Sequence, residues 1–130
     1  MSIENILDYK TVAVVGISED PTRPSNFVAR FLMEHGYKII PVNPKLTEWE
    51  KKKCYPDLLS IPVKVDIVDI FRRSEAIPPI VDEAIAIKAK VVWMQEGIIN
   101  EEAAAKAEKA GIEVVMDKCI KIEYAKFKSR

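Results

Sequence analysis

Short apolar runs rich in β-branched residues alternate along this chain with segments whose apolar residues recur at helical spacing. Five runs are expected to form strands, and they span residues 11–16, 38–42, 65–71, 91–94 and 113–116. Short, almost wholly apolar runs are typical of strands that a parallel sheet buries on both faces. Alternation with helices predicts right-handed crossovers and helices on both faces of the sheet. The predicted fold is therefore a doubly wound, parallel, five-stranded α/β sheet in three layers, with residues 1–130 as a single domain.

Polar residues in these runs indicate where two of the strands lie in the sheet. Pro41 cannot donate a ladder hydrogen bond, so we expect the strand 38–42 at an edge of the sheet, or distorted there. Residues 65–71 alternate between polar and apolar, which is typical of a half-exposed edge strand. Asn100, followed by two glutamates, is expected to cap the helix that precedes the last strand. The segment 120–130 is expected to form a short basic helix or to lack order.

The chain has only four glycines, at positions 16, 36, 97 and 111, and no two of them are close together. Average usage would give about nine. The glycine-rich motifs that bind dinucleotides and nucleoside triphosphates are absent, so phosphate binding would need another device. Gly36 and Gly111 are expected to end helices. Gly16 and Gly97 follow the first and fourth strands, which we expect to flank the point where the strand order reverses.

Charge and cysteine content bear on several classes of function. Lysine and arginine total 20, as do aspartate and glutamate, so the chain is not expected to bind nucleic acid or a membrane surface. No apolar run approaches the ~18 residues of a membrane-spanning helix. The N-terminus lacks a secretory pattern and the two cysteines form no C-x-x-C pair, so a cytoplasmic location is expected. With one histidine, no transition-metal site of the usual kind is expected.

Two residues of the long connection 43–56 have two interpretations each. Cys54 follows three lysines, and nearby cations lower the pKa of a thiol, so Cys54 is either reactive or an ordinary loop cysteine. Trp49 either covers a ligand or a partner surface, or packs against the solvent side of the core.

In sheets of this kind, ligands bind beyond the carboxyl ends of the strands. Residues 16–25 follow the first strand, and Gly16 would let the backbone approach a ligand closely. Ser25 offers a hydroxyl at a helix N-terminus and Arg23 a guanidinium, both suited to a phosphate. Two neighbouring acidic residues would repel a phosphate unless they point to solvent, and an ordinary βα loop is the alternative. The candidate binding residues of this segment are Gly16, Ile17, Ser18, Arg23, Pro24 and Ser25.

Four more segments follow strands at the same edge, and the last of them, 117–119, adds Lys118 as a possible further cation. Lys45 stands where NAD-binding proteins carry an acid that holds the ribose, which favours a phosphate on or near the ribose over a free diol. Arg72 or Arg73, after the third strand, could reach a diphosphate, although both also fit solvated loop charges. A local concentration of cations on a neutral protein suits an anionic nucleotide. The candidates in these segments are Asn43, Pro44, Lys45, Phe71, Arg72, Gln95, Glu96 and Gly97.

The same segments carry a family resemblance, because its motifs recur in order from about Asn5 to Tyr124. These motifs are Val12–Ser18, Arg23–Ser25, Ile40–Lys45, Val65–Arg72, Trp93–Ile98 and Val114–Cys119. They resemble those of the small stand-alone CoA-binding domain proteins, which are similar to the N-terminal domain of the succinyl-CoA synthetase α subunit.

The resemblance implies a Rossmann-like domain that holds coenzyme A. It implies that the loop Gly16–Ser25 receives the phosphates and that Lys45 lies near the adenosine end. The turns at Phe71–Arg72 and Gln95–Gly97 would line the rest of the cleft. Nothing in the chain matches the synthetase's phosphorylated histidine, so the resemblance carries over binding and not ligase activity.

Three functions remain open from the sequence. The first is a non-catalytic protein that binds CoA or acyl-CoA as a sensor, carrier or regulatory module, with a homodimer or a protein partner possible. The second is an NADP-linked oxidoreductase or an acyl-CoA-handling enzyme, for which Cys54, Cys119 and His35 are the available groups. The third is an interaction module whose nucleotide cleft is vestigial.

Overall fold

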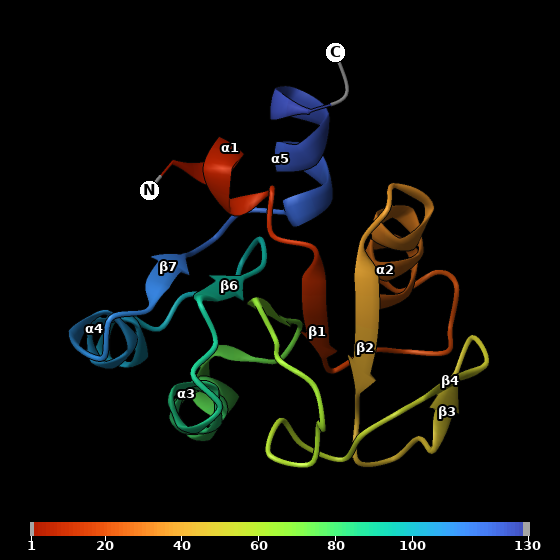
Figure 1. Cartoon of the computed structure of the whole chain (residues 1–130), viewed down its shortest axis with the longest axis horizontal. Helices are drawn as coiled ribbons and strands as arrows, with labels where there is room; N and C mark the ends of the chain where they lie inside the picture. Colours follow the sequence, from red (N-terminus) through yellow and green to blue (C-terminus); the bar gives the residue numbers. More distant parts are fainter. Residues whose placement is uncertain (1, 129–130) are drawn as a thin grey trace.

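Five parallel strands form the central sheet of the structure, a computed structural model that describes residues 2–128. The strands are β1 (Thr11–Val15), β2 (Lys38–Val42), β5 (Ile67–Ile70), β6 (Val91–Met94) and β7 (Glu113–Val115). They pair in the order β2-β1-β5-β6-β7 (Figure 1). The predicted doubly wound, Rossmann-like α/β fold is confirmed, while the extent of the domain over residues 1–130 stays a prediction.

Helices cover both faces of the sheet and give the three predicted layers. They are α1 (Ile3–Ile6), α2 (Pro24–Glu34), the 3-10 helix η1 (Ser74–Ala76), α3 (Ile77–Ala86), α4 (Glu101–Lys109) and α5 (Ile120–Phe127). Figure 1 shows α3 and α4 on one face of the sheet and α2 and α5 on the other, with α1 against α5. The C-terminal segment is thus helical as far as Phe127, and residues 129–130 lie outside the described residues.

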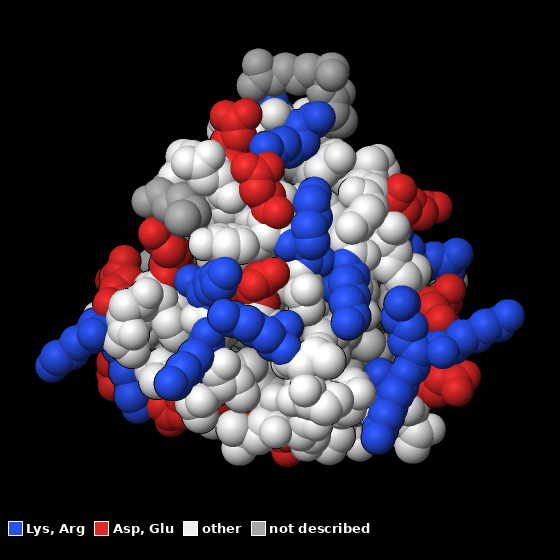
Figure 2. Space-filling model, viewed as in Figure 1, with Lys and Arg blue, Asp and Glu red and all other residues white. Residues whose placement is uncertain are grey.

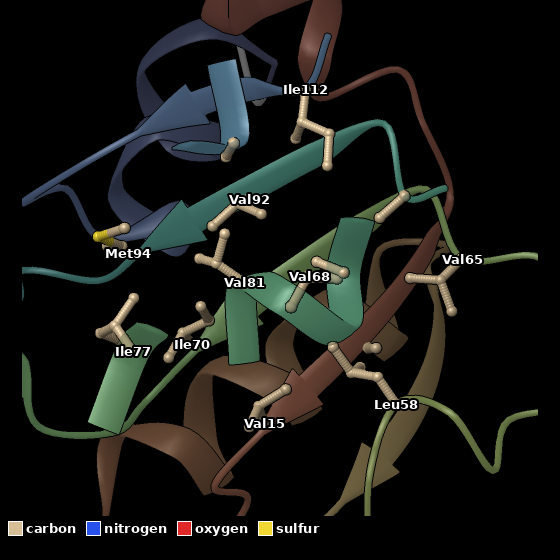
Figure 3. Close-up of a cluster of buried hydrophobic side chains, with 14 of the residues drawn as sticks. Val15, Leu58, Val65, Val68, Ile70, Ile77, Val81, Val92, Met94 and Ile112 are labelled. Atoms are coloured by element: carbon tan, nitrogen blue, oxygen red, sulfur yellow. The ribbon is translucent and has the colours of Figure 1, made fainter. Parts of the chain in front are cut away.

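Alternating side chains of the strands fill two separate cores. Val68 and Ile70 of β5, with Val92 and Met94 of β6, belong to the core under α3 (Figure 3). Trp93, between the last two, belongs to the second core, which α2 and α5 cover. All residues of β5 and β6 are buried, as expected for strands covered by helices on both faces.

The strand order reverses between β1 and β5. From β1, the sheet continues through β2 on one side and through β5, β6 and β7 on the other. The expectation that the first and fourth strands flank this point is therefore wrong, as is the edge position expected for residues 65–71. Asp69 of β5 is wholly buried, opposite Val14 of β1 and Trp93 of β6. The polar alternation in this strand reflects a buried carboxyl group and not a face open to solvent.

β2 is an edge strand of the sheet, as Pro41 predicts. A later segment of the chain lies along its outer side, where the N–H of Tyr55 donates to the carbonyl of Pro41 over 3.0 Å. The carbonyl of Tyr55 in turn accepts from the N–H of Asn43 over 2.9 Å, and Val42 and Tyr55 form an isolated parallel bridge. The outer side of β2 is therefore partly covered.

A small hairpin interrupts the connection after β2, and the sequence pattern does not predict it. Its strands are β3 (Glu48–Trp49) and β4 (Lys52–Lys53), paired antiparallel. Glu50 and Lys51 at its tip have φ angles of 49° and 65°. Such values suit the type I′ turn of a two-residue hairpin, although glycine and asparagine adopt them more easily. The hairpin matters because it places Trp49 inside the molecule, where this side chain is only 2% exposed.

Asn100 caps α4 as predicted. Its Oδ1 accepts a hydrogen bond from the N–H of Ala103 over 2.9 Å, and its Nδ2 donates to the carbonyl of Ser74 over the same distance. The cap therefore also ties the loop after β6 to the segment after β5.

Candidate functional site

A cleft of about 920 Å³ opens at the carboxyl edge of the sheet. Its walls come from the segments that follow β1, β5 and β6 and from the first turns of α2 and α5. The residues that line it are Gly16, Ser18, Arg23, Pro24, Ser25, Phe27, Val28, Phe71, Arg72, Arg73, Ser74, Glu75, Gln95, Glu96, Gly97, Ile98, Cys119, Lys121 and Ile122. The cleft thus lies where ligands of doubly wound sheets bind, beside the point of strand reversal.

A second cavity of about 270 Å³ lies beside the cleft, toward β2 and α3. Gly16 and Arg72 line both cavities. The other residues of the smaller cavity are Val15, Val42, Pro44, Pro56, Asp57, Leu58, Ala76, Pro79, Ile80 and Glu83. Arg72 therefore stands at the junction of two spaces, one on each side of the sheet edge.

Eleven of the fourteen predicted site residues line one or both of these cavities. Of the others, Ile17 is wholly buried in the core beneath α2, and Asn43 donates from Nδ2 to the carbonyl of Ile17 over 2.8 Å. Lys45 is exposed, and its backbone N–H donates to Oδ1 of Asn43 over 2.8 Å. Ile17 and Asn43 thus shape the loop rather than line the cleft, and Lys45 lies beside Pro44 at the smaller cavity.

Gly16 is the point where the loops after β1 and β5 meet. Its φ of +88° belongs to the left-handed region, and a Cβ atom at this position would lie 2.6 Å from the carbonyl oxygen of Phe71. The same atom would lie 2.8 Å from Cδ of Arg72. Only glycine fits such a close approach, so the floor at the junction of the cavities depends on this residue.

Three side chains fix the orientation of the loop after Gly16. The carbonyl of Ser18 accepts from Nδ2 of Asn26 over 2.7 Å and from Nε1 of Trp49 over 2.9 Å, and Asn43 holds the carbonyl of Ile17. No peptide bond in the described residues is cis, so the N–H that follows each carbonyl points the opposite way. The N–H groups of Ser18 and Glu19 therefore face away from these side chains, and neither finds an acceptor within residues 2–128. The N–H of Ser18, a residue that lines the cleft, is available to an anion there.

The first turn of α2 adds further donors to the cleft. This helix begins at Pro24, and no side chain among the described residues caps it. Ser25 lines the cleft and is only 5% exposed, and its hydroxyl has no hydrogen-bond partner in the described part of the chain. An unpartnered hydroxyl on a largely buried residue at the positive end of an eleven-residue helix is suited to an anionic ligand.

The acidic residues of this loop do not oppose an anion, because neither Glu19 nor Asp20 lines the cleft. The N–H and the hydroxyl of Thr22 both donate to Oδ1 of Asp20, over 2.9 and 2.7 Å. These hydrogen bonds lower the pKa of the Asp20 carboxyl, and Arg23, 3.9 Å away, adds to the effect. The cleft itself is lined by the cations Arg23, Arg72, Arg73 and Lys121 and by the acids Glu75 and Glu96.

Residues of α5 form the far end of the cleft, and sequence reasoning did not place them there. Gln95 accepts the N–H of Ile120 at its Oε1 over 3.2 Å, and the N–H of Gly97 donates to Asp117 over 2.7 Å. These bonds hold the first turn of α5 against the loop after β6. Local sequence carries no signal for this contact, because the helix follows the last strand and folds back across the sheet. The α5 residues missed in this way are Lys121 and Ile122. The other lining residues that sequence reasoning did not include among its candidates are Phe27, Val28, Ser74, Glu75 and Ile98.

Cys54 and Trp49 are both buried and belong to the core that α2 and α5 cover. Cys54 is 4% exposed, and its thiol lies 3.6 Å from the carbonyl of Asn43. Burial raises the pKa of this thiol, so the neighbouring lysines do not activate it as one interpretation predicts.

Within residues 2–128 no three metal-ligating side chains gather, and no helix has the length and apolar character that crossing a bilayer requires.

Comparison with known proteins gives three results of interest. A family model described as a CoA binding domain matches residues 10–125. An uncharacterized protein of Bacillus subtilis, YneT, is 42% identical over 116 residues, which make up 89% of this chain and 86% of that protein. A hypothetical protein from Pyrococcus horikoshii has a structure that matches with a TM-score of 0.93 at 40% identity, covering 98% of this chain and 92% of that one.

A longer relative shares only this region. The α subunit of ADP-forming acetate–CoA ligase I from Pyrococcus furiosus is 37% identical over 98 residues. These residues make up 71% of this chain and 21% of the ligase subunit. The chain therefore corresponds to about a fifth of that subunit.

Proposed function

The chain belongs to the CoA binding domain family, as its motifs predict, and we propose that it binds coenzyme A, free or as an acyl thioester, at the carboxyl edge of the sheet. The observation that carries this proposal is the pair of cavities that meet at Gly16 and Arg72. An elongated ligand with an anionic centre and two different ends fits two spaces joined at a cationic point.

The diphosphate is assigned to the junction of the cavities. Arg72 supplies a guanidinium there, and the N–H of Ser18 and the hydroxyl of Ser25 supply donors from the wall of the larger cleft. Backbone amides, a helix N-terminus and arginine are the groups that proteins use to bind phosphates. A full glycine fingerprint is not required for this arrangement, since only Gly16 has to approach the ligand.

The two ends of the ligand are assigned to the two cavities. The adenosine takes the smaller one, where Pro44, Pro56 and Ile80 offer apolar surface to a base. Lys45 is the residue proposed for the ribose phosphate. Figure 2 shows lysine and arginine side chains over the hairpin β3–β4 at its lower right, with acidic side chains among them. The pantetheine arm takes the larger cleft toward α5. The sheet is about 19 Å wide from β2 to β7, which suits a long ligand.

The role proposed for the protein is to sense or carry CoA, or to regulate a partner in response to it, rather than to catalyse a reaction. The ligase relative uses a region like this chain for about a fifth of its length, so its activity depends on more than this region. A cytoplasmic location and a homodimer or protein partner are proposed with it.

Calorimetric titration is expected to rank CoA and acetyl-CoA above NADP and NAD, and to give at least tenfold weaker CoA binding for Arg72→Met. Methionine keeps most of the side-chain stem and removes the guanidinium of Arg72, the residue that together with Gly16 lines both cavities. Lys45→Ala should weaken CoA more than dephospho-CoA, because only CoA carries the phosphate on the ribose. NADP binding as tight as that of CoA would refute the proposed function, and equal losses for the two CoA forms would refute the role of Lys45.

A Trp49→Phe variant is expected to bind CoA about five- to tenfold more weakly while losing about 1 kcal/mol of stability. The phenyl ring keeps the packing, but the carbonyl of Ser18 loses one of its two donors and the loop amides lose their fixed direction. Trp93→Phe is the matched control, because it also removes a buried indole donor, to Lys118, 2.7 Å away. If Trp49→Phe loses this stability but keeps the CoA affinity of the unmodified protein, Trp49 has no positioning role.

A further inference from the structure

Exposed apolar side chains gather at the α5 end of the cleft. In the described part of the chain, five large apolar residues are more than a third exposed: Phe27, Leu59, Val63, Ile99 and Ile122. Phe27, 42% exposed, and Ile122, 53% exposed, both line the cleft, and Ile99 directly follows the lining residue Ile98. Apolar surface left open to water at one end of a ligand cleft is surface that a ligand can cover with a gain in free energy.

The lining of the cleft combines polar and apolar side chains. Arg23 and Ser25, at the start of α2, and Arg72, after β5, are polar, whereas Phe27 of α2 and Ile122 of α5 are apolar. α2 and α5 pack against one another. Lys121 of α5 also lines the cleft, and its ammonium lies 5.6 Å from the centre of the Phe27 ring, so a charged group stands beside apolar surface that its stem extends.

We propose that the α5 end of the cleft is a subsite for the acyl chain of an acyl-CoA, and that acyl thioesters are preferred as ligands over free CoA. This inference rests on the proposed function. With the diphosphate at the junction near Gly16, the pantetheine arm runs past the loop after β6 and ends at α5. A carbon chain on its sulfur then reaches Phe27, Ile98 and Ile122, the apolar side chains that line that end.

The test is a calorimetric series with CoA, acetyl-CoA, butyryl-CoA and hexanoyl-CoA. Each added methylene that becomes buried is expected to tighten binding two- to fourfold, which follows from the free energy of burying one methylene. The quantity to compare between variants is the ratio of hexanoyl-CoA affinity to free CoA affinity. In Phe27→Ser and Ile122→Ser this ratio should fall severalfold toward one.

Leu59→Ser is the matched control, because Leu59 is 59% exposed and lines neither cavity. This variant should keep the ratio of the unmodified protein. If free CoA and all the thioesters bind with the same affinity, the acyl subsite is overturned and the proposed function still stands. If the ratio is unchanged in Phe27→Ser and Ile122→Ser, the acyl subsite is also overturned. The exposed apolar side chains Phe27 and Ile122 would then be left for another occupant, such as a partner protein. Failure of every CoA compound to bind would overturn both proposals.

Discussion

Gly16→Ala is expected to lower the free energy of unfolding by about 2–4 kcal/mol. Two costs add at this position. A residue with a side chain must adopt a φ of +88°, and its Cβ must share space with the carbonyl oxygen of Phe71, 2.6 Å away. That oxygen belongs to the backbone directly after β5, so it cannot move without disturbing the centre of the sheet. Urea denaturation of the variant and the unmodified protein measures the difference.

Gly36→Ala separates the two costs. Gly36 has a φ of +90°, but a Cβ there would meet nothing within 4 Å. It should therefore lose only the conformational part, about 1–2 kcal/mol. Gly16→Ala should also weaken CoA binding at least tenfold, since the new methyl group would displace Cδ of Arg72 from its place 2.8 Å away. Equal losses of stability in the two variants would show that the contact with Phe71 relaxes at no cost.

Asp69 is expected to make the protein less stable as the pH rises. The carboxyl group is wholly buried in the middle strand of the sheet, and neither of its oxygens has a hydrogen-bond partner within the described residues. Burial disfavours the charged form and raises the pKa of this group well above its ordinary value. Between the ordinary pKa and the raised one, the folded state therefore holds a proton that the unfolded state releases.

The direction of the pH effect follows from this difference in bound protons. Because the folded state binds more protons, stability is highest below the ordinary pKa and falls as the pH rises toward the raised pKa. The slope for one group is about 1.4 kcal/mol per pH unit inside that window. Asp69→Asn should remove the slope, and urea denaturation between pH 4 and pH 7.5 compares the two proteins. Parallel pH profiles would contradict the burial of an ionisable group at this position.

An apolar residue at the same position provides the companion test. Asp69→Val should raise the free energy of unfolding at pH 7 by about 2–4 kcal/mol, because it removes a carboxyl group with no partner from the interior. Valine is also well suited to a central strand. A loss of stability in this variant would mean that the carboxyl group has a stabilising contact.

Much of the fold follows from local patterns in the sequence. The runs at 38–42 and 91–94 match β2 and β6 residue for residue, because apolar β-branched runs bounded by polar segments carry their own signal. Pro41 also indicates the edge position of β2 correctly, since a missing N–H is a local property.

What local patterns do not carry is the order of the strands and the contacts that close the cleft. An aspartate in a strand, such as Asp69, indicates a solvent-facing side chain. Only the sheet order shows that its strand, β5, lies in the middle of the sheet, where Asp69 is buried. The same limit applies to α5, whose first turn completes the cleft far along the chain from β1. The backbone turns at Gly16 and Gly97 were predictable, whereas Phe27, Lys121 and Ile122 enter the cleft through a long-range contact between α2 and α5.

The partly covered edge at β2 has a consequence for how copies of this chain associate. Proteins commonly associate by adding a strand of one chain to an open sheet edge of another, because the N–H and carbonyl groups of an edge strand are unpaired. Here Pro41 offers no donor, and Tyr55 already pairs with the backbone of Pro41 and Asn43. The opposite edge, β7, is only three residues long. A dimer built by extending one sheet into the next is therefore disfavoured at both edges, which leaves helical surfaces as the route by which two copies would join.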